Sequence, residues 1–279
     1  MTANQSVELA ALLTILAATL YAIWRGRRQR STLSAYMKAH RRGDYEIALQ
    51  IAEGFRERGA ITRSYCFHHG SSLMQLGKLD EAETWLLQSV SLSKRNEAHQ
   101  PGTAGIERQI RLTALGSSTL GQLYLEQSRY DEALTCFEES LRDWPNRGAT
   151  HRSIAELWLR RGKPDEALKW ATLAIEKEKS SKPLSKKTGE MNFAEELATL
   201  AWAVAEASND RPRVDKLVAQ AIPLAKISVS TKAQVHYHSG LAYAALGERE
   251  RSSEYFKKAA DMDRLGRWGR AARSRIESQ

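Results

Sequence analysis

A spacing of 34 residues recurs between small-residue landmarks along this chain of 279 residues. Three pairs of landmarks share it: Gly43 and Gly77, Ala48 and Ala82, and Ala133 and Ala167. Self-similarity at a fixed period of roughly 20 to 50 residues is the sequence signature of proteins built by stacking one structural unit. The period therefore restricts the fold to a repeat architecture.

Residues 121–145 show what one unit looks like. Leu120, Leu123 and Tyr124 recur at the spacing of one helical face, and this pattern stops shortly after Tyr124. A second helical pattern follows and carries Tyr130, Ala133, Leu134 and Phe137. Pro145 cannot continue a helix and disfavours helical dihedrals in the residue before it. The unit is predicted to be a helical hairpin.

Small residues are expected where the two helices of the hairpin touch. Glycine costs about 1 kcal/mol inside a helix, so Gly121 is explained by close packing against Ala133 rather than by propensity. The set Leu120, Gly121, Tyr124, Tyr130, Ala133, Phe137, Ser140 and Pro145 resembles the tetratricopeptide repeat, with serine replacing the usual alanine at Ser140. The resemblance implies an all-α solenoid, a right-handed superhelix of helix–turn–helix repeats.

The period divides residues 31–279 into six expected units and a terminal helix. The repeats are expected at about 29–62, 63–96, 114–147, 148–181, 193–226 (degenerate) and 233–266, with a capping helix over 267–278. The residues expected to pack the repeats are Gly43, Tyr45, Ala48, Gly70, Gly77, Ala82, Gly121, Tyr124, Tyr130, Ala133, Phe137, Pro145, Gly162, Ala167, Gly240, Tyr243, Gly247 and Phe256.

Two segments interrupt the repeats. Residues 95–112 add 17 residues to the period, and they are either a tolerated surface insertion or a functional loop. Residues 177–190 contain five lysines with Ser, Pro and Gly, and they are interpreted as a mobile linker, with anion binding as the alternative.

The N-terminal segment is uncharged from Leu9 to Trp24. After a short tail, 1–6, residues 7–24 are predicted to form a transmembrane helix of about 27 Å. A cleaved signal peptide is disfavoured because the positive residues follow the apolar run. A soluble or amphipathic helix is the remaining alternative.

Positive charge after this segment predicts its orientation. Residues 25–30 form a basic juxtamembrane segment, which places the N-terminus outside and the repeats on the cytoplasmic side, most naturally of a bacterial inner membrane. The residues expected at the membrane interface, in contact with lipid, are Tyr21, Trp24, Arg25, Arg27 and Arg28.

Net charge is +9, and two arginine clusters account for it. One is the segment 25–30, and the other lies between Arg264 and Arg275. A nucleic-acid binder usually carries a basic stripe along its domain, so nucleic acid is not the expected partner. The C-terminal cluster is interpreted as a solvated cap, with contacts to phosphate, membrane or nucleic acid as alternatives.

Catalytic and metal-binding patterns are missing from the sequence. Cys66 and Cys136 are far apart and are expected to be reduced core thiols. The close histidine pairs, His68 with His69 and His236 with His238, do not face each other on a helix. No catalytic residue, cofactor, metal or small-molecule substrate is predicted.

The resemblance implies that a partner binds in a concave groove lined by the first helix of each repeat. The candidate groove residues are Met37, Arg41, Phe67, Ser71, Met74, Gln122, Arg152, Glu156 and Arg160. Their mixture of apolar and charged types would suit an extended or helical peptide. The expected function is a non-enzymatic, membrane-tethered scaffold for a protein or peptide partner. A secreted or periplasmic repeat protein with a cleaved N-terminus and an accessory subunit of an enzyme complex are the alternatives.

Overall fold

The computed structural model describes the backbone of residues 3–56, 61–97, 103–180 and 186–278. Side chains are described for 14–28, 30–56, 61–95, 110–180 and 189–278.

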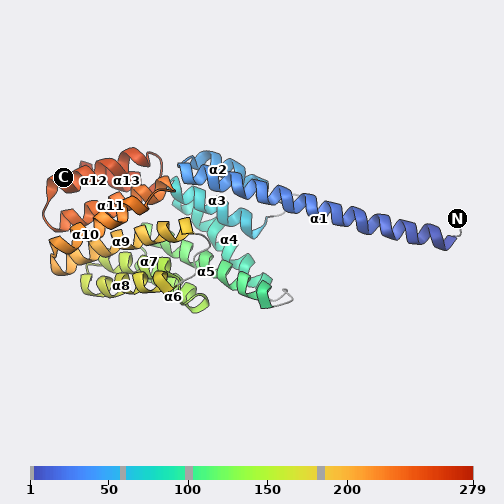
Figure 1. The fold of residues 1–279 in the computed structure, drawn as a ribbon, viewed down its shortest axis with the longest axis horizontal. Helices are drawn as coiled ribbons and strands as arrows, with labels where there is room; N and C mark the ends of the chain where they lie inside the picture. The colour runs from blue at the N-terminus through green and yellow to red at the C-terminus, as the bar shows by residue number, and fades with distance from the viewer. Residues whose placement is uncertain (1–2, 57–60, 98–102, 181–185, 279) are drawn as a thin grey trace.

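Every regular element in these ranges is helical, and consecutive helices pack into hairpins that stack along the chain (Figure 1). The helices are α1 (Ala3–Arg42), α2 (Tyr45–Ala52), the short 3-10 helix η1 (Glu53–Phe55), α3 (Arg63–Gln75), α4 (Leu79–Glu97), α5 (Thr103–Glu126), α6 (Tyr130–Asp143), α7 (Gly148–Arg160), α8 (Pro164–Ser180), α9 (Lys186–Ser208), α10 (Arg211–Leu224), α11 (Val229–Ala245), α12 (Arg249–Met262) and α13 (Arg267–Glu277).

Six hairpins form this way, and each turns on a residue in the left-handed backbone region. Gly43, Gly77, Gly162 and Gly247 have φ between 67° and 82°. Ser128 and Asn209 take the same position in the other two hairpins, with φ of 61° and 52°. The conformation costs a residue with a Cβ more than it costs glycine, although asparagine tolerates it. Two hairpins therefore lack the turn glycine but keep the same left-handed turn.

Within a hairpin, small residues let the two helices approach closely. A Cβ on Gly121 would lie 2.7 Å from Phe137, and one on Gly240 would lie 2.6 Å from Phe256. Neither distance is sterically possible without a shift of the aromatic ring. Ala48, Ala82, Ala133 and Ala167 are fully buried in the second helices. Close packing between the paired helices thus rests on small residues in several of the hairpins.

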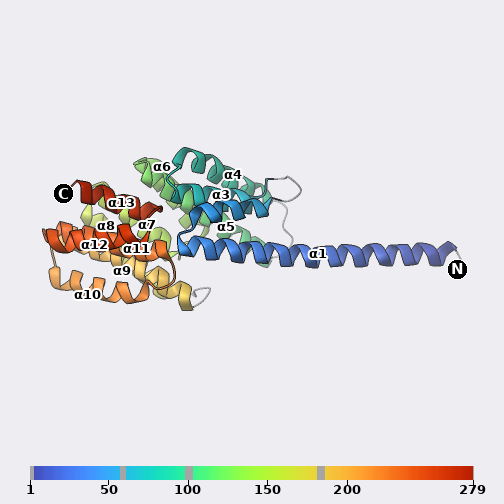
Figure 2. The same cartoon turned by 90° about the horizontal axis from the view of Figure 1, so that it is seen from above.

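The ends of the solenoid meet. The Tyr45 hydroxyl donates to Asp263 at 3.1 Å, and Arg270 on α13 donates to the Gln75 carbonyl at 2.5 Å. A Cβ on Gly43 would lie 3.2 Å from Val229 at the start of α11. The last repeat and α13 therefore pack against the first two repeats, and the views in Figures 1 and 2 show α2 beside the C-terminal helices.

The N-terminal helix α1 is 40 residues long, and its first part projects away from the repeats (Figures 1 and 2). The described helices include none that is long and apolar enough to cross a membrane. This finding contradicts the predicted single-pass membrane topology and does not support the predicted transmembrane helix over 7–24. The lipid contact of residues 7–30 stays a prediction. The uncharged stretch from Leu9 to Trp24 spans about 24 Å as a helix, which is shorter than the roughly 30 Å hydrocarbon core of a bilayer.

The residues assigned to the membrane interface are solvent-exposed in this helix. Tyr21 and Trp24 are 44% and 53% exposed, and Arg25, Arg27 and Arg28 are exposed as well. The backbone of the juxtamembrane segment, 25–30, is a continuous part of α1. The side chains of residues 7–13 lie outside the described ones.

The two interruptions contain more helix than expected. α4 continues to Glu97 and α5 begins at Thr103, so only residues 98–102 of the insertion fall between helices, and they lie outside the described residues. Most of the predicted mobile linker is helical, since α8 ends at Ser180 and α9 begins at Lys186. The linker prediction for 181–185 lies outside the described residues.

Candidate functional site

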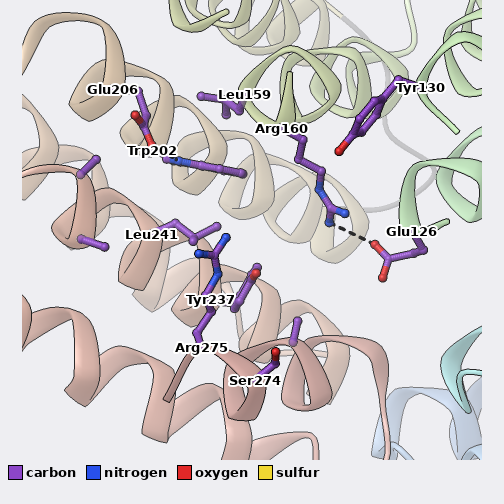
Figure 3. Close-up of a pocket in the computed structure, with 13 residues that line it drawn as sticks. Glu126, Tyr130, Leu159, Arg160, Trp202, Glu206, Tyr237, Leu241, Ser274 and Arg275 are labelled. Carbon is purple, nitrogen blue, oxygen red and sulfur yellow. Dashed lines mark hydrogen bonds and ion pairs between the residues drawn. The ribbon is translucent and has the colours of Figure 1, made fainter. Parts of the chain in front are cut away.

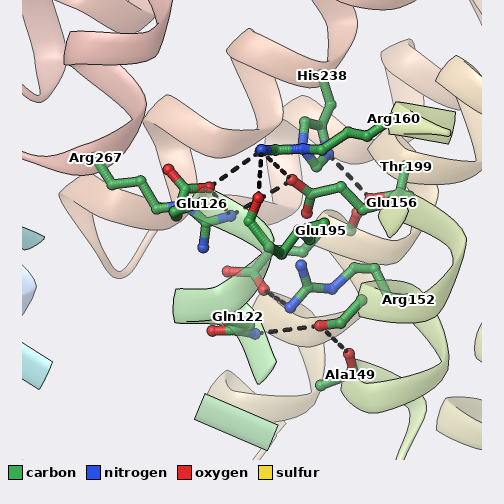
Figure 4. Close-up of polar contacts among 12 residues, drawn as sticks. Gln122, Glu126, Ala149, Arg152, Glu156, Arg160, Glu195, Thr199, His238 and Arg267 are labelled. Atoms are coloured by element: carbon green, nitrogen blue, oxygen red, sulfur yellow. Dashed lines mark hydrogen bonds and ion pairs between the residues drawn. The ribbon is translucent and has the colours of Figure 1, made fainter. Parts of the chain in front are cut away.

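The inner face of the solenoid carries a network of buried charges around α7. Arg152, Glu156 and Arg160 recur every four residues and therefore lie on one side of this helix. Arg152 forms an ion pair with Glu195 of α9 at 3.0 Å, and Arg160 forms one with Glu156 at 2.7 Å. Figure 4 shows these side chains converging from separate helices.

The C-terminal helix α13 completes this network. Arg267 is only 5% exposed and pairs with Glu126 of α5 at 2.8 Å and with Glu156 at 3.4 Å. Arg160 also contacts Glu126, at 3.1 Å. Two arginines and two carboxylates from α5, α7 and α13 therefore bind one another inside the superhelix (Figure 4).

The pKa shifts of Glu156 and Arg160 agree with these ion pairs. Burial would raise the pKa of the Glu156 carboxyl, but the charges of Arg160 and Arg267 outweigh burial and lower it to about 2. Burial would likewise lower the pKa of Arg160, and Glu156 and Glu126 instead raise it above its ordinary value. The charged forms are therefore the ones that the fold stabilises, although the groups are withdrawn from water.

Aromatic contacts hold α13 beside the network. The Trp268 ring packs 5.6 Å from Tyr237 and 5.1 Å from His238, measured between ring centroids. Burial lowers the pKa of His238 to about 3, so this imidazole is neutral, and its Nδ1 lies 3.0 Å from the Thr199 hydroxyl. α13 thus occupies part of the concave surface and is not a solvated cap.

A cavity of about 650 Å³ remains between α13 and the inner helices (Figure 3). Its wall combines aromatic, apolar and charged side chains. Trp202 and Leu241 lie on one side, and the Arg160–Glu126 pair lies across from them. Arg275 of α13 points into the same space and is exposed. The remaining lining comes from Tyr130, Leu159, Glu206, Tyr237, Ala244, Ala245, Ala271 and Ser274.

The structure places the nine predicted groove residues in three settings. Met74, Arg152 and Glu156 are buried, so they offer little surface to a partner. Phe67, Ser71 and Gln122 are half-buried on α3 and α5, and Gln122 donates to Ser153 at 3.2 Å. Arg160 lines the cavity, whereas Met37 and Arg41 are exposed on α1. The residues do not form one continuous open groove.

The cavity also uses residues that the sequence interpretation missed. Trp202, Tyr237 and Arg275 were not among the candidates, and neither was Arg267 in the network. One signal was available, because Trp268, Ala272 and Ile276 recur every four residues and mark an apolar stripe on α13. An apolar stripe on an arginine-rich helix indicates packing on one side.

Comparison with known proteins agrees with the repeat geometry. Models of the tetratricopeptide repeat match residues 118–183, 64–96 and 233–264. The chain contains tetratricopeptide repeats. Those matches fall on hairpins α3/α4, α5/α6, α7/α8 and α11/α12. A search of curated proteins gives no match.

Solved structures share the tetratricopeptide-repeat fold. One is NprR in complex with its cognate peptide NprX, at a TM-score of 0.56 and 16% identity, with 96% of this chain and 76% of that chain covered. Another is pilF of Pseudomonas aeruginosa, at a TM-score of 0.51 and 11% identity, with 90% and 99% covered. Identities this low show the common fold.

Proposed function

We propose that this chain is a non-enzymatic protein-interaction module that captures a peptide segment of a partner in the cavity between α13 and the inner helices. Tetratricopeptide-repeat proteins generally serve as scaffolds for protein–protein interaction, and the fold shared with NprR accommodates a peptide in that protein. The cavity beside α13 is the observation that carries the proposal.

The side chains that line the cavity suit a peptide with an apolar anchor residue next to an acidic residue. Trp202 and Leu241 supply an apolar wall, as is usual for sites that bury a ligand side chain. Arg275 supplies a positive charge that makes no ion pair with any described residue. Arg160 is already neutralised by Glu126 and Glu156, so Arg275 is the cation available to a partner carboxylate.

A displayed random-peptide library selected on the full-length protein tests this proposal. Ala244 is exposed and lines the cavity, so Ala244→Trp fills the space without disturbing the core. Ala22 is equally exposed on the projecting part of α1, so Ala22→Trp is the matched control. Enriched peptides are expected to bind at least about tenfold more weakly to Ala244→Trp, a loss of about 1.4 kcal/mol, and unchanged to Ala22→Trp.

The chemistry is tested separately with Arg275→Glu. Peptides that carry a carboxylate beside their apolar anchor are expected to lose affinity for this variant, because a partner carboxylate would then face a like charge. Enriched peptides that bind Ala244→Trp and wild type equally would place binding elsewhere and refute the cavity as the site.

A further inference from the structure

A second hollow, of about 630 Å³, lies on the outer side of α1 and shares no residue with the cavity beside α13. Its apolar part consists of Leu33 and Met37 of α1 with Ile227, which precedes α11. Leu33 and Met37 are 41% and 37% exposed although they are large apolar side chains. We refer to the α1 surface from Arg30 to Arg42 that lines this hollow as the α1 outer face.

The two sides of α1 differ in this region. Tyr36 and Ala39 are buried in the core that α1 forms with α2 and α3. The outer face instead carries Met37 beside basic residues, and its basic lining consists of Arg30, Lys38, Arg41 and Arg42. One side of α1 therefore packs against the repeats, and the other side is exposed.

The α1 outer face carries an excess of positive charge, although Arg42 also lines a neighbouring hollow with Asp261 and Asp263. Neither the lining of the outer face nor the sequence between Arg25 and Arg42 contains an acidic residue. Lys38, Arg41 and Arg42 form no ion pair with any residue that the structure describes. His40 adds no charge, since burial lowers its pKa to about 4. The summed potential of such a surface favours an acidic partner.

We propose that the α1 outer face docks an acidic amphipathic helix of a partner protein. Leu33 and Met37 are four residues apart and therefore form one apolar strip along α1, against which the apolar face of a partner helix can pack. Ile227 extends the apolar strip beyond α1. From Arg30 to Arg42 the helix runs about 18 Å, the length of a partner helix of about 12 residues.

Residue types in the hollow distinguish this partner from nucleic acid. Single-stranded nucleic acid binds on basic surfaces that offer aromatic rings for stacking, and the lining of this hollow contains no aromatic residue. Apolar side chains surrounded by cations are complementary to leucines flanked by carboxylates. Charge complementarity and the apolar strip therefore favour a partner helix over nucleic acid.

Fluorescence anisotropy with the full-length protein tests the proposal. The probe is a labelled helical peptide of about 16 residues with leucines at spacings of three and four and glutamates elsewhere. A scrambled peptide of the same composition keeps the charge and loses the apolar face. The amphipathic peptide is expected to bind about tenfold more tightly than the scrambled one, and its affinity is expected to fall as salt is added.

Matched variants locate the site. The double charge reversal Lys38→Glu with Arg41→Glu is expected to weaken peptide binding at least about tenfold. Lys216→Glu with Lys257→Glu makes the same change in net charge at exposed lysines elsewhere and is expected to have little effect. Met37→Ser is expected to weaken binding several-fold, whereas Leu87→Ser, at a similarly exposed position on α4, is not.

Four results would overturn the proposal. The first is no binding of the amphipathic peptide, and the second is equal binding of the scrambled peptide, which would show charge attraction alone. The third is tighter binding of a single-stranded oligonucleotide or of anionic vesicles than of the peptide, with loss in the Lys38→Glu and Arg41→Glu variant. The fourth is an equal effect of the control charge reversals. None of these results bears on the cavity beside α13, whose test uses different residues.

Discussion

Arg267 on α13 and Arg41 on α1 carry the same guanidinium group in opposite surroundings. Arg267 is 5% exposed and contacts two carboxylates, while Arg41 is exposed and forms no ion pair with any described residue. Arg267 thus holds helices together, whereas Arg41 remains available to a partner. Sequence composition does not distinguish the two roles, but burial and pairing do.

Arg267→Ala is expected to have the largest effect on stability. It leaves Glu126 and Glu156 with less positive charge in a site withdrawn from water, and breaking a buried pair in this way typically costs about 3–5 kcal/mol. Urea unfolding followed by circular dichroism measures the change. Arg264→Ala, at an exposed position near the same helix, is the control and is expected to change stability by less than about 0.5 kcal/mol. Equal effects of the two substitutions would abolish the distinction between inner and outer charges.

Glu196→Gln sharpens the comparison because Glu196 is buried without being paired. Neither of its carboxylate oxygens has a hydrogen-bond partner among the described residues. Burial, followed by the charge of Glu178, raises the pKa of Glu196 from 4.5 to about 9. Between these values the folded protein keeps a proton that the unfolded chain has released. Stability therefore falls by about 1.4 kcal/mol for each pH unit of increase in this window.

Glutamine cannot ionise, so Glu196→Gln is expected to remove this slope. Urea unfolding at several pH values from about 5 to 8 measures the difference between variant and wild type. The variant is expected to gain relative stability steadily as the pH rises. Parallel pH dependences would show that Glu196 is ionised in the folded protein and would contradict its neutral state.

Lys38→Ala with Arg41→Ala is expected to have the smallest effect on stability. Exposed charges without partners contribute little to folding, so the free energy of unfolding should change by no more than about 0.5 kcal/mol. The same urea experiment measures it. A decrease of several kcal/mol in the free energy of unfolding would mean that Lys38 and Arg41 stabilise the fold, as Arg267 does.

The repeated hairpins were predictable because their cause is local. Gly121 against Phe137 and Gly240 against Phe256 are contacts within one unit, and in both the two residues are 16 positions apart. Ser128 shows the limit of this approach, since it occupies a left-handed turn position without the glycine that marks the turn elsewhere. The spacing of 34 residues between Ser128 and Gly162 locates this turn although its glycine is missing.

The arrangement of α13 was not predictable from such patterns. Arg267 and Glu156 are 111 residues apart, and no periodicity specifies which inner helix a terminal helix contacts. The groove prediction therefore treated Arg152 and Glu156 as available, although both are buried and Glu156 is paired with Arg267 of α13. The single-pass topology was inferred from an uncharged run and its flanking arginines, and the described helices include none long and apolar enough to cross a membrane.

The bond between Tyr45 and Asp263 has a consequence for the order of folding. It joins residues 218 apart, and Asp263 follows all the repeats in the chain. On the ribosome the early hairpins can form as soon as they emerge, because their contacts are local. Closure of the two ends must wait until the last repeat has been synthesised. A nascent chain that stops before Asp263 would consequently keep the solenoid open at its first repeat, which distinguishes an incomplete molecule from a finished one.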